Sequence, residues 1–188
     1  MSEETTYLAN HLLIALPVLD DPNFARSVVL ICRHDAEGAM GIVINRSADY
    51  SLGALMEQLN IEIQDAALSD RTVFSGGPVH PERGFVLHDG QRIWDSTLKV
   101  ADDLHVTTSR DLLEAMAAGK GPGRTLFALG CAGWEQGQLE RELNENAWLT
   151  VPADPALIFE MPLEQRWWMA SDSIGVDPFK ITDYSGHV

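Results

Sequence analysis

Short apolar runs and longer amphipathic stretches alternate along the chain, and this pattern predicts strands interspersed with helices. Residues 12–16 are apolar and stop at a proline, which predicts a buried strand. Residues 27–33 and 39–44 are two β-rich runs joined by five residues that end in glycine, which predicts a hairpin. Residues 28–32 show no polar alternation, so we expect this strand to be covered on both faces of its sheet.

The rest of the chain carries both strand and helix signals. Ser51 precedes apolar residues at helical spacing and predicts the cap of a short helix, while Ser109 and Gly119 predict the start and the stop of another. In full, we predict strands at 72–75, 84–88, 105–108, 125–129 and 157–159, helices at 52–59, 109–118, 134–144 and 162–174, and a polar connection at 60–71.

These elements together predict the fold class. Hairpin signals lie beside strand–helix units, which favours an α+β fold with a mixed β-sheet and helices packed around it over a doubly wound parallel sheet. The chain shows no repeat, no low-complexity tract and no linker rich in proline or serine. We therefore predict that residues 1–188 form a single domain.

Charge restricts the classes of partner. Thirteen Lys and Arg residues face 28 Asp and Glu residues, which gives a formal net charge of −15. A surface this negative repels phosphate backbones and anionic lipids, so nucleic acid and membranes are disfavoured as partners. The chain begins with a polar, acidic segment unlike a signal peptide, and no apolar stretch approaches the roughly 20 residues that span a bilayer. We therefore expect a cytoplasmic location.

The residue types that usually carry metal or cofactor chemistry form no recognised pattern. The histidines form neither an HxH nor an HExxH pair, and Cys32 and Cys131 form no CxxC pair. The glycines at 76–77 and 119–123 match neither the dinucleotide fingerprint nor the P-loop. We predict no metal and no cofactor. Gly76 and Gly77 instead indicate a tight turn or bulge, or a close approach of the backbone to a ligand or another segment.

Cys131 supports an alternative in which the protein is an enzyme. It lies between the predicted strand at 125–129 and the predicted helix at 134–144, where helix N–H groups lower a thiol pKa. With a base such as His88 or His34 brought close by the fold, Cys131 would serve a small hydrolase. The surrounding Gly-x-x-Gly pattern is not the GxSxG motif of a nucleophile elbow, so a structural thiol is the favoured interpretation.

Further motifs are spread in order over nearly the whole chain. They comprise LIALP at 13–17, FARSV at 24–28, GAMGIVIN at 38–45, GGPV at 76–79, RGFVLH at 83–88, TSRD at 108–111, LGCAGW at 129–134, GQLE at 137–140, NAWL at 146–149, RW at 166–167 and GH at 186–187. In these motifs the chain resembles the AlgH/YqgE family of bacterial proteins. The resemblance implies a compact α+β fold with a partly barrel-like mixed sheet. It also implies a link, by name, to regulation of alginate production in pseudomonads, for which the label transcriptional regulator is sometimes used.

Two positions depart from the family pattern. Cys131 stands where the family usually has Tyr, which weakens the case for a cysteine nucleophile as the shared activity. Ser47 stands where the family often has Pro, a change that we expect to affect only the exit of a strand. The net charge argues against direct DNA contact, so a regulatory role would run through a protein or a small ligand.

We therefore expect a non-catalytic protein that binds an unknown small ligand or a protein partner, with a DNA-binding regulator as the weakest alternative. Polar residues and glycines at strand ends are where loops on a rigid scaffold tend to carry function. Arg83 would supply a cation, Asn45 and His88 hydrogen bonds, and Trp134 an apolar wall. The candidate ligand-binding residues are Asn45, Gly76, Gly77, Pro78, Arg83, His88, Gly130, Gly133 and Trp134.

Overall fold

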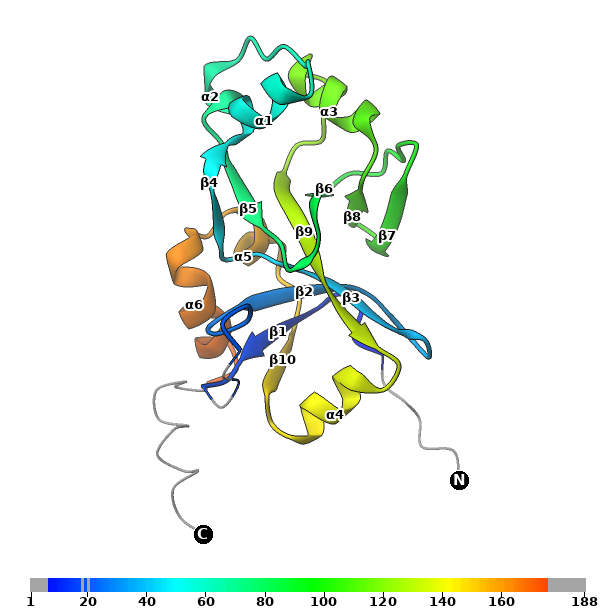
Figure 1. The fold of residues 1–188 in the computed structure, drawn as a ribbon, viewed down its shortest axis with the longest axis vertical. Coiled ribbons are helices and arrows are strands. Elements are labelled where there is room, and N and C mark those ends of the chain that lie inside the picture. The colour runs from blue at the N-terminus through cyan, green and yellow to red at the C-terminus, as the bar shows by residue number, and fades with distance from the viewer. Residues whose placement is uncertain (1–6, 18, 20, 176–188) are drawn as a thin grey trace.

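The structure is a computed structural model that describes residues 7–17, 19 and 21–175. Within these residues, helices lie around one ten-stranded sheet (Figure 1). The strands are β1 (His11–Ala15), β2 (Val28–Asp35), β3 (Gly38–Val43), β4 (Ser47–Ser51), β5 (Thr72–Ser75), β6 (Val79–His88), β7 (Thr97–Ala101), β8 (Leu104–Thr107), β9 (Thr125–Glu135) and β10 (Trp148–Pro152). The helices are α1 (Leu52–Gln58), α2 (Ala66–Ser69), α3 (Arg110–Ala117), α4 (Gln138–Asn144), α5 (Pro155–Phe159) and α6 (Arg166–Asp172), the last preceded by a 3-10 turn at Leu163–Gln165. None of these helices, in the part of the chain described, is long and apolar enough to cross a lipid bilayer.

The sheet is continuous and curled. Its strands follow the order β10-β1-β2-β3-β9-β6-β8-β7, while β5 joins β9 from the side and carries β4. The β5–β9 pairing is parallel and the other pairings are antiparallel, which confirms the predicted mixed sheet and the α+β class. β2 and β7 are distant in this order yet lie close in space. The strands from β2 to β7 therefore curl into a half-barrel, as the family resemblance implied.

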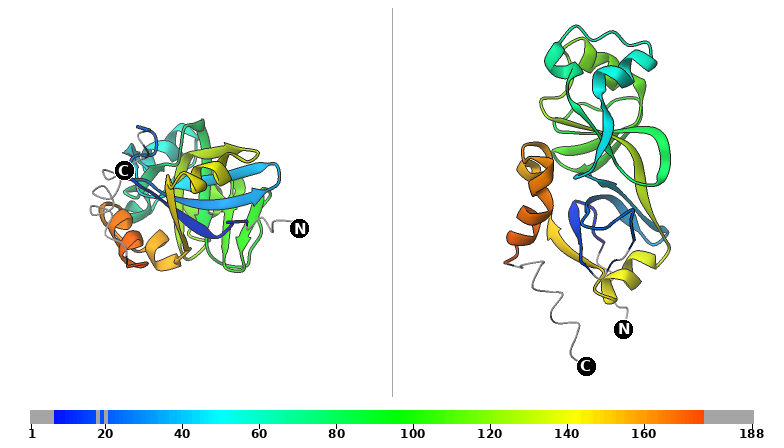
Figure 2. Two further views of the ribbon diagram at one scale, coloured as in Figure 1. Left: turned by 90° about the horizontal axis from the view of Figure 1, so that it is seen from below. Right: turned by 60° about the vertical axis from the view of Figure 1, so that its left-hand side comes forward.

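The long strand β9 joins two lobes that share the sheet (Figure 1). Its first half pairs with β5 and β6, in the lobe that carries α1, α2 and α3. Its second half pairs with β3, in the lobe that contains β1, β2, β10 and α4. The turned view of Figure 2 shows α5 and α6 along one side of the molecule. A single strand thus determines how the two lobes are placed.

Apolar side chains cover both faces of the sheet. Along β2, Val28 and Leu30 belong to one apolar cluster, and Val29 and Ile31 belong to another. All four side chains are fully buried, which confirms that this strand is covered on both faces. α6 packs on the first cluster through Trp167, and α4 packs on the second. The lack of polar alternation in the sequence therefore has a direct cause in the packing.

Buried side chains of α6 fasten the C-terminal segment to the sheet. The Trp167 Nε1–H group donates to the carbonyl of Ala15 at 3.1 Å. The buried Arg166 guanidinium donates to the carbonyls of Ile44 and Met161. Burial lowers the pKa of Arg166 to about 10, because a low-dielectric environment disfavours the charged form. The group stays protonated at neutral pH and keeps both hydrogen bonds.

Two helix signals read from the sequence are confirmed. α1 begins after Ser51, whose Oγ accepts from the Ala54 N–H at 3.3 Å. α3 begins after Ser109 and ends before Gly119, which has the left-handed φ of +75° expected of a helix stop. Ser109 makes no cap hydrogen bond: its Oγ accepts instead from the Ser96 N–H at 3.0 Å, and its hydroxyl donates to the Asp111 carboxylate at 2.5 Å.

The predicted helix at 134–144 is confirmed in its second part, where α4 ends at Asn144, but its start is wrong, and the predicted strand at 157–159 is wrong. β9 continues to Glu135 because its last residues pair with β3, and α4 begins only at Gln138. Residues 155–159 instead form α5, whose start is marked by Pro155 and by the Asp154 carboxylate, which accepts from the Ala156 N–H at 3.0 Å. For the predicted helix, pairing with the distant strand β3 outweighs the local glycine-rich turn signal. For the predicted strand, the sequence contains the helix-start signal Asp154-Pro155, but the short apolar run that follows it was interpreted as a strand.

Three strands and one short helix lie in segments for which no regular structure was predicted. β7 and β10 occupy the two ends of the strand order, and β4 pairs only with β5. These edge strands are partly exposed, so their sequences lack the strong apolar pattern of β1 and β2. The predicted polar connection at 60–71 contains α2.

Candidate ligand-binding cleft

A cleft of about 310 Å³ opens at the mouth of the half-barrel, where the two lobes meet. It is here called the Arg83 cleft. It lies between β2 and β3 on one side and β6, β7 and β8 on the other. Its lining residues are Arg33, Met40, His80, Arg83, Phe85, Ser96, Thr97, Leu98, Val106, Thr108 and Cys131. Barrel mouths are common ligand sites because a rigid sheet supports side chains that converge from several strands.

A wide bulge in β6 places Arg83 at this mouth. Val79 pairs with Cys131 and Gly84 pairs with Leu129, so residues 80–83 lie opposite the single residue between those two partners. His80, at the start of the bulge, has a φ of +47°, an uncommon conformation for a residue with a side chain. Bulges re-aim side chains and occur often beside functional sites, where strained backbone is retained.

Glycine is required where the backbone of β9 meets the turn before β6. Gly130 has a φ of +77°, and a Cβ there would lie 2.3 Å from the carbonyl oxygen of Gly77. A Cβ on Gly77 would in turn lie 2.3 Å from the carbonyl carbon of Cys131, and one on Gly76 would lie 2.3 Å from the Gly130 oxygen. The Gly76 N–H donates to Leu129 at 2.7 Å. These glycines therefore allow two chain segments to pack together, which was one of the readings that the sequence left open.

Arg83 is held in place by weak contacts that leave its charge available. Its guanidinium lies over the Phe85 ring at 5.7 Å, and its Nη2 donates to the Thr108 hydroxyl over a long 3.4 Å. No ion pair joins Arg83 to another of the described residues. Arg33, at the rim, has its Nε 3.7 Å from an Asp35 carboxylate oxygen, and both side chains are exposed. A guanidinium has five N–H donors, so most of the donors of Arg83 are open to a ligand.

Hydroxyl groups form one wall of the cleft. The Ser96 and Thr108 hydroxyls are 2.9 Å apart, and the Thr97 hydroxyl lies 2.8 Å from that of Thr107. Met40, Phe85, Leu98 and Val106 supply the apolar part of the lining. The lining contains no Asp or Glu, although acidic residues outnumber basic ones 28 to 13 in the chain.

Cys131 lies in the middle of β9, so the helix start that was expected to activate it does not exist. Burial raises the pKa of the Cys131 thiol, and the nearby charge of Arg83 offsets this only in part. Burial raises the pKa of Cys32 as well. A buried thiol with a raised pKa is a poor nucleophile, so the premise of the hydrolase alternative is removed.

Among the described residues, His, Cys, Asp and Glu do not form a group of three that could hold a metal ion.

The structure brings part of the predicted site together. Gly76, Gly77, Gly130 and Arg83 meet around the β6 bulge, and Pro78 connects the glycines to β6. Gly133 lies further along β9 than Gly130, near the Val79 side chain, and does not line the cleft.

Three predicted ligand contacts have structural roles elsewhere. The Asn45 side chain accepts from Val28 N–H at 2.9 Å and donates to the Arg26 carbonyl at 2.8 Å, and so joins two segments. Trp134 is buried on the other face of the sheet and donates from Nε1 to Glu142 at 3.2 Å.

His88 lies at the far end of β6 and is fully buried. Its Nε2 is 2.7 Å from the Thr107 hydroxyl, and its ring stacks on His105 at 5.6 Å. Burial lowers the pKa of His88, the His105 charge lowers it further, and Asp89 opposes the change. None of Asn45, Trp134 and His88 lines the Arg83 cleft, because strand pairing places them on other faces or at other ends of the sheet.

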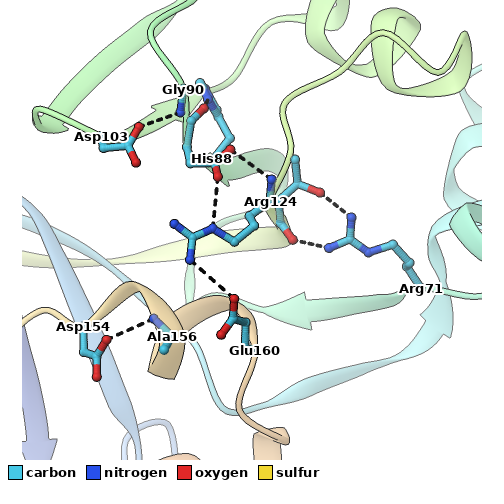
Figure 3. Close-up of polar contacts among 10 residues, drawn as sticks. Arg71, His88, Gly90, Asp103, Arg124, Asp154, Ala156 and Glu160 are labelled. Atoms are coloured by element: carbon cyan, nitrogen blue, oxygen red, sulfur yellow. Dashed lines mark hydrogen bonds and ion pairs between the residues drawn. The ribbon is translucent and has the colours of Figure 1, made fainter.

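An ion-pair network ties the far end of β6 to the C-terminal segment. Figure 3 shows Arg124, immediately before β9, between Glu160 and the residues that follow β6. Its Nε donates to Asp89 at 3.0 Å and its Nη1 lies 3.6 Å from Glu160, while Arg71 donates twice to Thr125. Burial alone would raise the pKa of Asp89, but the hydrogen bonds and charge of Arg124 outweigh it and lower that pKa. This network supports the joint between the lobes and stands apart from the cleft.

A second cleft, of about 250 Å³, lies on the opposite side of β6. Its walls include Glu82, Leu113 and Phe127, and its cation is Arg110. Arg110 is already paired with Glu114 at 2.9 Å. The Arg83 cleft is therefore the better candidate, because the charge of Arg83 is not matched by a carboxylate.

Most residues of the cleft carry no distinguishing signal in the sequence. Thr108 belongs to the TSRD motif, which could have drawn attention to it, and Arg33 follows the apolar run of β2. Ser96 and Leu98 lie at β7, a strand that was not predicted at all. Phe85 and Val106 look like ordinary strand residues. Only the curling of the sheet brings them to one place.

The fold and the cleft define a class: an α+β protein with a half-barrel sheet, helices around it and a cleft at the barrel mouth. Within that class, residues 12–179 match the family described as DUF179, AlgH-like, so the chain belongs to the AlgH-like family. It is 61% identical over 183 residues to a UPF0301 protein of Stenotrophomonas maltophilia strain K279a, covering 97% of each chain. It is 59% identical over 187 residues to a UPF0301 protein of Xanthomonas campestris pv. campestris strain 8004, covering 100% of each. The resemblance read from the sequence motifs is confirmed.

Two solved structures are similar in fold. The solution structure of the AlgH protein from Pseudomonas aeruginosa matches with a TM-score of 0.81 and 45% identity over 100% of both chains. A crystal structure of a Corynebacterium diphtheriae protein matches with a TM-score of 0.68 and 20% identity, over 92% of this chain and 90% of that one. The second likeness concerns the fold alone. The family carries no assigned molecular activity, so function is argued from the cleft.

Proposed function

We propose that this protein is a non-catalytic cytoplasmic protein that binds a small ligand in the Arg83 cleft. The observation that carries the proposal is the β6 bulge, which holds His80 in an uncommon conformation and presents Arg83 at the barrel mouth. Backbone strain of this kind costs about 1–3 kcal/mol and tends to persist at ligand sites. A volume of about 310 Å³ lies at the lower end of the range for small-molecule pockets.

A small ligand is favoured over the alternatives by charge and by the state of the thiol. A net charge of −15 opposes the approach of DNA, because an acidic protein repels its phosphates. A regulatory role would then be indirect, through the bound ligand. Catalysis through Cys131 is disfavoured because burial raises the pKa of its thiol.

The test is a thermal-shift screen of the full chain against a library of metabolites. A ligand present at 100 times its Kd should stabilise the folded state by about 2.7 kcal/mol, which is roughly 5–10 °C for a chain of this size. Arg83→Ala, with an affinity at least tenfold lower, should reduce the shift to about half or less. The matched control is Arg141→Ala, an exposed arginine on α4 outside the cleft lining, which should leave it intact. A ligand that stabilises both variants equally would place the site elsewhere.

A further inference from the structure

We propose that the ligand of the Arg83 cleft is a small organic anion, with one carboxylate or phosphate group bound to Arg83 and a short apolar body buried beside it. This inference rests on the proposed function and adds the chemical class of the ligand. Four features of the cleft support it.

The first feature is the local sign of charge. The lining contains Arg33, His80 and Arg83 but no carboxylate, in a chain where acidic residues predominate two to one. The buried Cys131 thiol beside Arg83 stays neutral and adds no negative charge. Arg33 lies 3.7 Å from the Asp35 carboxylate, which is outside the lining, so Arg83 is the cation of this mouth that no carboxylate among the described residues matches.

The second feature is the geometry of Arg83. Its guanidinium contacts Phe85 and Thr108 only weakly and has no carboxylate partner among the described residues. A guanidinium held in this way offers a planar pair of N–H donors, which suits the two oxygens of a carboxylate or phosphate. The Ser96 hydroxyl, 2.9 Å from that of Thr108, extends the polar wall on which such a group would rest.

The third feature is the apolar wall next to the cation. Met40, Phe85, Leu98 and Val106 line the same cleft, so a ligand bound to Arg83 has carbon surface within reach. An inorganic ion would leave this surface wet. An anion with a short hydrocarbon body would cover it and gain about fourfold in affinity per buried methylene group.

The fourth feature is size, which favours small anions over large ones. A volume of about 310 Å³ holds roughly ten water-sized groups at about 30 Å³ each. A polyanion would extend beyond the mouth and meet a protein surface of net charge −15, whereas a small anion experiences mainly the nearby cations. The cleft thus fits a metabolite-sized anion.

Matched probes test the class of ligand. Hexanoate and hexyl phosphate should shift the backbone amide resonances of Arg83, Thr108 and Cys131 in the 15N-labelled full chain, and hexanamide and 1-hexanol should not. Acetate should bind far more weakly than hexanoate, by about fourfold for each methylene that is buried. The stronger of the two anions identifies the head group as carboxylate or phosphate.

Variants separate the role of Arg83 from effects on folding. Arg83→Ala should weaken binding of the anion at least tenfold, because a charge-assisted hydrogen bond is lost. Arg83→Lys keeps the charge without the planar pair of donors and should lie between Arg83→Ala and the unchanged chain. Arg141→Ala should bind as the unchanged chain does. Thermal melts of each variant, compared with the unchanged chain, report whether it is folded.

The outcomes distinguish this inference from the proposed function. If the neutral probes shift the same resonances as strongly as the anions, the ligand is not an anion, although the cleft still binds. If the anions shift only residues outside the cleft, the inference fails. If neither these probes nor the metabolite library produce any change at the cleft, the inference and the proposed function both fail.

Discussion

Replacement of Gly130 by alanine is expected to destabilise the protein strongly, because this glycine lies where the two lobes are joined. The added Cβ would lie 2.3 Å from the Gly77 oxygen and 3.3 Å from the Pro81 Cα, both of which belong to backbone and cannot rotate away. The φ of +77° adds a cost of about 1–2 kcal/mol for any residue with a Cβ. Overpacking adds about 1–3 kcal/mol. Gly130→Ala should therefore lower the free energy of unfolding by about 2–5 kcal/mol.

Gly119→Ala is the matched control for this prediction. Gly119 has nearly the same φ, +75°, but no atom lies within 4 Å of the position that its Cβ would take. In this variant the free energy of unfolding should fall only by the cost of the left-handed φ, about 1–2 kcal/mol. The difference between the two variants thus isolates the close approach of β9 to the turn before β6.

Urea unfolding followed by circular dichroism gives both free energies, provided that the m-values agree. Thermal melts should show the same order, with about 2–4 °C per kcal/mol for a chain of this size. Equal losses in Gly130→Ala and Gly119→Ala would refute the reasoning. They would mean that the backbone around Gly77 moves aside at no cost, and that the cleft is not built on a rigid joint.

Three further outcomes are expected. Burial lowers the pKa of His88 below its ordinary 6.5, so the unfolded chain binds a proton at this residue at a higher pH than the folded chain does. The free energy of unfolding should therefore fall as the pH drops below about 6.5, and urea titrations of His88→Gln should show a smaller fall. Cys131 should react with iodoacetamide more slowly than a free peptide thiol at pH 8 in the folded chain, since its pKa is raised; faster reaction would revive the hydrolase alternative. Arg166→Leu should cost about 1–3 kcal/mol in urea unfolding, because two carbonyls lose their donor, and no loss would mean that water replaces the guanidinium.

Where sequence signals were local, they predicted the elements well. Ser51 and Gly119 mark helix ends through their own side-chain oxygen or backbone freedom, so the prediction needed no knowledge of the rest of the chain. The run at 28–32 is apolar throughout because both faces of β2 are covered. In each case the residue pattern and the physical cause lie within a few positions of each other.

Predictions failed where a distant partner decided the outcome. The glycines at 130 and 133 look like a turn, yet β9 passes through both because β3 and β6 pair with it on either side. His88 and Arg83 lie five positions apart on the same strand, and they were expected to converge. The β6 bulge directs Arg83 to the cleft, while His88 is buried at the far end against His105.

The family, the mixed α+β class, the acidic charge and the choice of Gly76, Gly77, Gly130 and Arg83 as candidate site residues came from the sequence alone. These follow from motifs, local propensity and composition, which are properties of neighbouring residues. The folded structure was needed to show that the glycines let β9 pack against the turn before β6, and that Arg83 lines a cleft with apolar side chains and the hydroxyls of Ser96, Thr97 and Thr108. The physical reason is the curl of the sheet: it brings β2 and β7 together from opposite parts of the strand order and so creates a cleft that no single segment encodes.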